Sequence, residues 1–98
     1  MARPPRIYPE EAMAAWPASR LNAYMAAWDA EESAACEALI AAGRGHEKAG
    51  ETRAKAKEGD VLAIRCVTAR DAAMAAHSER QTRRRWHGSD KPIRRKAF

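Results

Sequence analysis

The residues with the clearest chemical potential lie near the C-terminal end, where three consecutive arginines precede a tryptophan. Guanidinium groups bind phosphate through two parallel hydrogen bonds, and a neighbouring indole can stack on a base or on another guanidinium. The sequence therefore predicts a polyanion-binding segment, with nucleic acid or a nucleoprotein complex as its partner. Its candidate residues are Arg80, Arg83, Arg84, Arg85, Trp86, Lys91, Arg94, Arg95 and Lys96.

Charge is distributed unevenly along the 98 residues, which carry a net charge of +5. Residues 7–42 contain one basic and six acidic residues, whereas residues 79–98 contain eight basic and two acidic ones. A basic segment of this kind is typical of proteins that bind nucleic acid or another polyanion. In an alternative interpretation, the basic tail folds back on the acidic helix of the same chain or of a neighbouring copy.

The acidic segment supports a second hypothesis of a different class. Asp29, Glu31 and Glu37 could face a basic surface of a protein partner. The chain would then be an inhibitor or adaptor of the mobile-element (phage) type, for example an antagonist of a bacterial defence system. A third alternative is a structural oligomer, such as a homodimer, whose basic tails bind neighbouring acidic helices.

Metal binding, cofactor binding and catalysis find little support in the sequence. The cysteines and histidines lack the paired close spacing of structural zinc sites, and no glycine-rich phosphate loop or nucleophile motif is present. We therefore expect a non-enzymatic protein without a cofactor. The candidate ligands considered are Cys36, His46, Cys66, His77 and His87.

The sequence also bears on the cellular compartment. We expect a cytoplasmic protein with two reduced thiols, because no secretory or membrane-spanning segment is recognisable. We further expect His77 to be a hydrogen-bonded core histidine.

The element that must position the arginines is a long helix over residues 60–86. With 100° per residue, Cys66, Ala69, Ala73 and Ala76 share one stripe with Leu62. The flanks of this stripe carry Val67 and Met74. Arg80 and Arg84 continue the stripe, and Arg83 and Arg85 extend to its sides. Because unpaired guanidinium groups cannot be buried, the last two turns must leave the core or meet an anion.

The remaining pattern predicts an all-α protein, a small helical bundle with a short N-terminal helix and a basic C-terminal tail. Alanine supplies 24 residues, which favours helix but leaves a thin core. Residues 9–16 can form two turns that close one end of the core through Met13 and Trp16. Residues 17–42 form a second helix with apolar residues spaced by seven. These are Leu21, Trp28, Ala35 and Ala42.

Two topologies are compatible with the middle of the chain. In the first, the chain turns at Gly43–Gly45 and at Gly59, so that three main helices form and Cys36 lies level with Cys66. In the second, one helix continues to Glu58 and the fold is a long antiparallel helical hairpin. We prefer the first, because two glycines around one arginine weaken a helix by roughly 2 kcal/mol.

The predicted domain covers residues 1–86, with an extended arm over residues 1–8 and a tail over residues 87–98. Arg3 and Arg6 of the arm could touch phosphate, as short basic arms do in some DNA-binding proteins. The sequence favours instead a solvated terminus that Ile7 and Tyr8 fix to the bundle.

Overall fold

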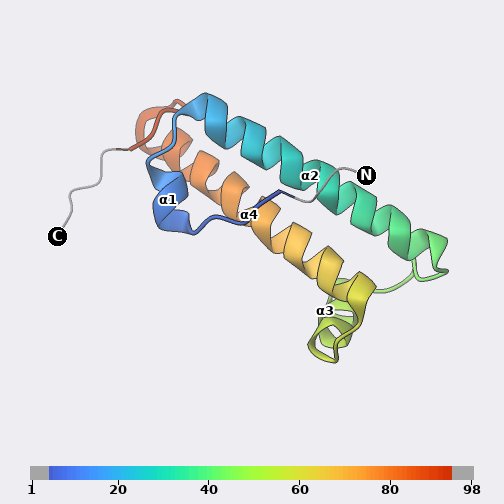
Figure 1. The fold of residues 1–98 in the computed structure, drawn as a ribbon. Helices are drawn as coiled ribbons and strands as arrows, with labels where there is room; N and C mark the ends of the chain where they lie inside the picture. Colours follow the sequence, from blue (N-terminus) through green and yellow to red (C-terminus); the bar gives the residue numbers. More distant parts are fainter. Residues whose placement is uncertain (1–4, 94–98) are drawn as a thin grey trace.

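The fold comes from a computed structural model, which describes residues 5–93. This part of the chain forms four helices and no strand: α1 (Glu10–Ala14), α2 (Ala18–Ala41), α3 (Ala49–Lys57) and α4 (Val61–His87). The long helices α2 and α4 lie antiparallel and side by side, while α1 and α3 lie toward opposite ends of α4 (Figure 1). The prediction of a small all-helical fold is therefore confirmed.

The seam between α2 and α4 follows a seven-residue spacing on both helices. In α2, Leu21, Trp28 and Ala35 are buried, as the sequence predicted. In α4, Ala69 and Ala76 are fully buried. Small side chains let two helices approach closely, so alanine contributes tight packing where it cannot contribute much buried area. Met74, which we expected on the flank of this seam, is instead 62% exposed.

Two glycine turns produce the first of the two predicted topologies. Gly43 has a φ of +76° and Gly59 a φ of +92°, a region that residues with a Cβ rarely adopt. The amide of Arg44 donates to the carbonyl of Leu39, which closes the C-terminal turn of α2. The alternative of one helix continuing to Glu58 is wrong, because α2 ends at Ala41 and α3 begins only at Ala49.

The two cysteines support the same topology. Both thiols are free, and the Cys66 thiol donates to the carbonyl of Ala35 over 3.4 Å. This contact brings Cys66 of α4 next to the residue that precedes Cys36 in α2. Burial raises the pKa of the Cys66 thiol, so the thiol form is favoured there.

The N-terminal segment closes the other end of the seam. Met13 and Trp16 are 1% and 6% exposed, in agreement with their predicted role. The amide of Tyr8 donates to the hydroxyl of Tyr24 over 3.2 Å, so Tyr8 attaches the arm to α2. Ile7 does not share this role, because it is 56% exposed.

Both ends of α4 are defined by local chemistry. The carboxylate of Asp60 accepts from the amide of Ala63 over 2.9 Å, which makes Asp60 the N-cap of α4. Gly88 has a φ of +68° and follows the last helical residue, His87. Because the chain turns there, Asp90 comes back toward the last two turns of α4.

Candidate nucleic-acid interface

Arg83 is not part of the accessible basic surface, because its side chain is fully buried. Its guanidinium donates to the carbonyl oxygens of Met13 and Asp90, over 2.9 and 2.8 Å, and to the carboxylate of Glu79 over 3.0 Å. The charge is therefore compensated by groups of the chain itself. Arg83 joins α1, α4 and the segment after α4, which is a structural role.

The expectation that Arg83 extends to the side of the stripe is wrong. Arg83 lies seven residues after Ala76 and 14 after Ala69, so it belongs to the same heptad row of the seam. A straight-helix projection drifts by about 20° per heptad relative to such a row. Over three heptads from Leu62, this drift moved Arg83 off the predicted stripe and Arg84 onto it.

Arg80 and Arg84 meet an anion within the chain. Arg80 Nε and Arg84 Nε donate to the carboxylate of Asp90 over 3.2 and 2.6 Å. Mainly through the Arg84 hydrogen bond, the pKa of Asp90 is lowered to about 2. Asp90 therefore neutralises part of the predicted site. The side chain of Arg84 is still 53% exposed, and some of its donors face solvent.

The remaining described candidates are accessible. Arg85 and Lys91 are exposed, and neither side chain has a hydrogen bond or ion pair within residues 5–93. The side chain of Trp86 is 73% exposed, which is unusual for an indole in a folded domain. Arg94, Arg95 and Lys96 lie outside the described residues. The free part of the site thus consists of Arg85, Trp86 and Lys91, with Arg84 at its edge.

Two of the four acidic residues of α2 are paired with α4. Asp29 lies 2.9 Å from the imidazole of His77, and Glu31 lies 2.6 Å from the guanidinium of Arg65. Glu37 is exposed and has no partner in the described part of the chain. His77 is hydrogen-bonded as expected, but it is exposed and not a core histidine.

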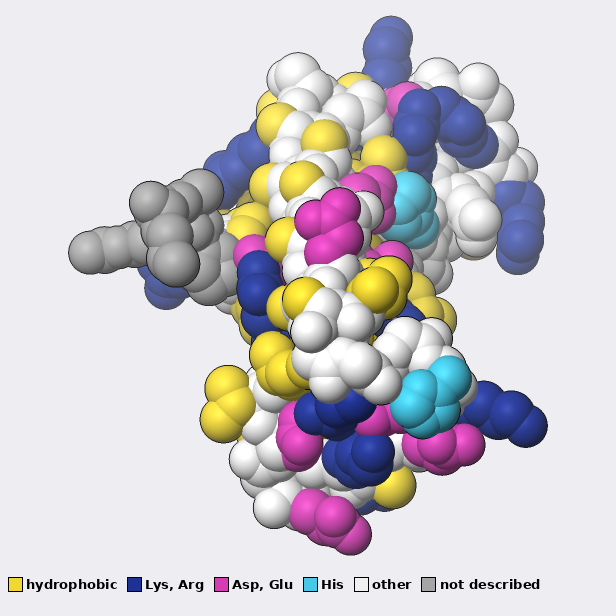
Figure 2. Space-filling model, turned by 90° about the vertical axis from the view of Figure 1, so that its right-hand side faces the viewer, with side chains coloured by type: hydrophobic (Ala, Val, Ile, Leu, Met, Phe, Trp, Pro, Cys, Tyr) yellow, Lys and Arg dark blue, Asp and Glu magenta, His cyan; other side chains and the backbone are white. Residues whose placement is uncertain are grey.

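The surface is consequently mixed in charge. On the face drawn in Figure 2, acidic side chains gather along the middle of the molecule, and the Lys and Arg side chains of its upper part lie mostly toward the edges. An open groove of about 440 Å³ lies between α2 and α4 beside the Asp29–His77 pair. Asp29 and Glu32 line it from α2, and Met74, His77 and Gln81 line it from α4.

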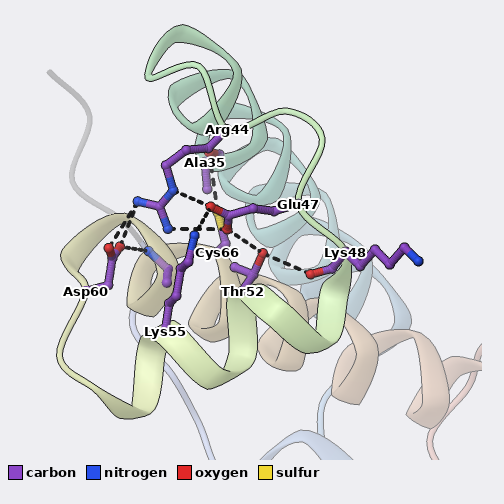
Figure 3. Close-up of polar contacts among 9 residues, drawn as sticks. Ala35, Arg44, Glu47, Lys48, Thr52, Lys55, Asp60 and Cys66 are labelled. Carbon is purple, nitrogen blue, oxygen red and sulfur yellow. Dashed lines mark hydrogen bonds and ion pairs between the residues drawn. The ribbon is translucent and has the colours of Figure 1, made fainter.

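A polar cluster that the sequence analysis missed lies at the other end of the molecule, away from Arg83 (Figure 3). The carboxylate of Glu47, whose side chain is 1% exposed, accepts from Arg44, from Lys55 over 2.6 Å and from Thr52 over 3.1 Å. Arg44 also binds Asp60, the N-cap of α4, over 3.1 Å. Hydrogen bonds from Arg44 and then Lys55 lower the pKa of Glu47 to about 2.

This cluster connects the turn after α2, helix α3 and the start of α4. Its only sequence signal was an arginine held between two glycines, which we used solely as a helix stop. Because the charged groups of the cluster bind one another, we assign it a structural role: it holds these three segments together.

Comparisons with known proteins add no assignment. No protein family model matches the chain, and neither the curated proteins nor the solved structures compared with it give a significant match. Within residues 5–93, no three His, Cys, Asp or Glu side chains are grouped so that they could hold a metal ion. None of the described helices has the length and apolar character needed to cross a membrane.

Proposed function

We propose that this protein is a small non-catalytic regulatory protein that binds nucleic acid, or a nucleoprotein complex, through the C-terminal end of α4 and the basic segment after it. The observation that carries this proposal is the exposed indole of Trp86 next to Arg85, whose side chain has no partner among residues 5–93. Stacking on a base and binding to a phosphate are the two contacts that such a pair can make.

The hydrogen bonds and ion pairs within the chain narrow the set of candidate residues that can bind nucleic acid. Arg83 is excluded because its donors are used inside the core. Arg80 and Arg84 are partly neutralised by Asp90, so their contribution requires a phosphate that competes with this carboxylate. Arg85 and Lys91 have no such competitor among residues 5–93, and they should make the first contacts.

The test is binding of labelled random duplex and single-stranded DNA and RNA over a salt series from 50 to 300 mM. We expect measurable binding at low salt that weakens linearly on a log–log scale, because each phosphate contact releases counterions. The double variant Arg85→Ala/Trp86→Ala should bind more weakly. It should also lower the salt slope by about 1, the value for one lost phosphate contact.

The matched control is Arg53→Ala, which removes an exposed arginine bound to Asp71 over 2.9 Å on the α3 side. This variant should bind as the parent protein does. Binding that is undetectable at 50 mM salt, or that does not change with salt, would remove the proposal.

A second candidate function is the protein-binding inhibitor or adaptor of the mobile-element type. The exposed, unpaired Glu37 and the groove lined by Asp29 and Glu32 favour it, because both offer negative charge to a basic partner. Copurification before and after nuclease treatment separates the two functions. A partner protein retained after nuclease treatment and lost with Glu37→Lys would support the second candidate, and loss with nuclease alone would support the first.

A further inference from the structure

The N-terminal arm and the first turn of α2 form a second cationic feature, in which Arg20, a residue that the sequence did not single out, joins Arg6 of the arm. The guanidinium carbons of Arg6 and Arg20 lie 5.4 and 5.6 Å from the centroid of the same ring, that of Tyr8. Arg20 also lies 4.3 Å from the centroid of Trp16. Two arginines 14 positions apart in the chain thus both lie beside the ring of Tyr8.

This aromatic surface is built as a rigid support. Tyr8, Trp16 and Tyr24 pack edge to face, with centroid distances of 5.0 Å for Tyr8–Trp16 and 5.1 Å for Trp16–Tyr24. The backbone amide of Tyr8 donates to the hydroxyl of Tyr24, which fixes the arm. A guanidinium that stacks on a ring keeps its N–H donors at its edge, where they are available to a ligand.

Neither arginine has an anionic partner in the described part of the chain. Both side chains are exposed, and no hydrogen bond or ion pair joins them to Glu10 or Glu11, the carboxylates nearest to them along the chain. Two like charges near one ring repel each other unless an anion lies between them. At the same end of the molecule, Arg80, Arg83 and Arg84 have such compensation, whereas Arg85 has none among residues 5–93.

Arg6 and Arg20 lie at the same end of the molecule as the C-terminal end of α4. Arg83 binds the carbonyl of Met13, which lies three residues before Trp16, so the aromatic cluster and the end of α4 share one end of the molecule. Helix α2 also begins there, without a side-chain cap and without an acidic residue in its first turn. Its dipole adds partial positive charge beside Arg20, although the two guanidinium groups define the site.

We propose that Arg6 and Arg20, held on Tyr8 and Trp16, form a phosphate-binding site that takes a phosphodiester of the same nucleic acid that the end of α4 binds. This inference rests on the proposed function for the identity of the ligand. The site contributes position and affinity without reading sequence, because it offers donors for phosphate and no described group for a base edge.

The first experiment measures the salt dependence of duplex binding for Arg6→Gln/Arg20→Gln. We expect weaker binding and a salt slope lower by about 0.9, the value for one phosphate contact. Arg53→Gln, a control away from this end, should keep the parent slope. If the parent protein binds duplex DNA and the double variant shows the same affinity and salt slope, the inference is overturned. The proposed function then remains in place. Circular dichroism and the Tm of each variant establish that it is folded.

The second experiment measures ligand binding to the parent protein alone, and variants serve only to assign resonances. Inorganic pyrophosphate is titrated into the parent protein, and the Nε–Hε resonances of the arginines are followed by NMR, with Arg6 and Arg20 assigned from the single Gln variants. Saturable shifts of these two resonances, larger than those of Arg53, support the site even if no nucleic acid binds. Shifts that are no larger than those of Arg53 overturn it even if nucleic acid binds elsewhere.

Discussion

Arg83 keeps a full positive charge inside a core built largely from alanine. Because an arginine cannot be deprotonated in a protein, its burial requires that its donors be satisfied. Two backbone carbonyls and one carboxylate do so, and they come from α1, from α4 and from the segment after it. A residue that sequence composition assigns to binding therefore holds three parts of the fold together.

Substitution separates this structural arginine from its accessible neighbour. We expect Arg83→Ala to destabilise the fold by about 3 kcal/mol, since breaking a buried charged pair leaves Glu79 and two carbonyls without this donor. Urea unfolding followed by circular dichroism measures the change.

The matched substitution is Arg85→Ala, two residues along the same helix. Arg85 is exposed and unpaired within the described residues, so its loss should change the free energy of unfolding by less than about 0.5 kcal/mol. Equal stability of the two variants would contradict the structural role of Arg83.

At the scale of the helices, the short helices α1 and α3 cover parts of α4 that α2 does not contact. Each packs against α4, and each is joined to the next helix by a short, sharp connection. Between α1 and α2 the connection depends on Pro17, and between α3 and α4 it depends on Gly59. The arrangement of the short helices is therefore sensitive to backbone conformation at these residues.

Two glycine substitutions test this dependence in opposite directions. Gly59→Ala should cost about 1 kcal/mol, because alanine is strained at a φ of +92°. Gly50→Ala should instead stabilise α3 by about 0.5 kcal/mol, since Gly50 is helical and a Cβ there meets nothing within 4 Å. The midpoint of urea unfolding reports both, and a stabilising Gly59→Ala would contradict the turn geometry.

Local signals predicted the elements well and the polar contacts poorly. Gly43, Gly59 and Asp60 act over one turn of chain, so their conformations could be read from the sequence. The pairing of Arg84 with Asp90 depends on how the chain turns after Gly88. The burial of Glu47 depends on where α3 packs, and neither outcome leaves a periodic pattern in the sequence.

At the scale of the whole molecule, two carboxylates at opposite ends respond to acid in the same way. The pKa of Glu47 is lowered from 4.5 to about 2, and that of Asp90 from 3.8 to about 2, chiefly by hydrogen bonds from Arg44 and Arg84. Both groups bind protons more weakly in the folded state than in the unfolded state. Their stabilisation is thus complete above about pH 5 and is lost as the pH falls toward 2.

We therefore expect the urea midpoint to be nearly constant between pH 6 and pH 5 and to fall steeply between pH 4.5 and pH 2.5. Glu47→Gln should lower the midpoint at pH 6 and flatten this fall, because its amide does not titrate. The control is Glu51→Gln, an exposed carboxylate of α3. Glu51→Gln should show the same pH dependence of the urea midpoint as the parent protein. If Glu47→Gln also showed the parent pH dependence, the stabilising role of Glu47 would be contradicted.

Helix α4 takes part in every extensive contact between the described helices, and it is the last of the four along residues 5–93. The apolar residues of α1 and α2 that pack against α4 consequently have no such partner until the ribosome has translated α4. A product that terminates early would display an uncovered alanine-rich and tryptophan-bearing surface to chaperones and proteases.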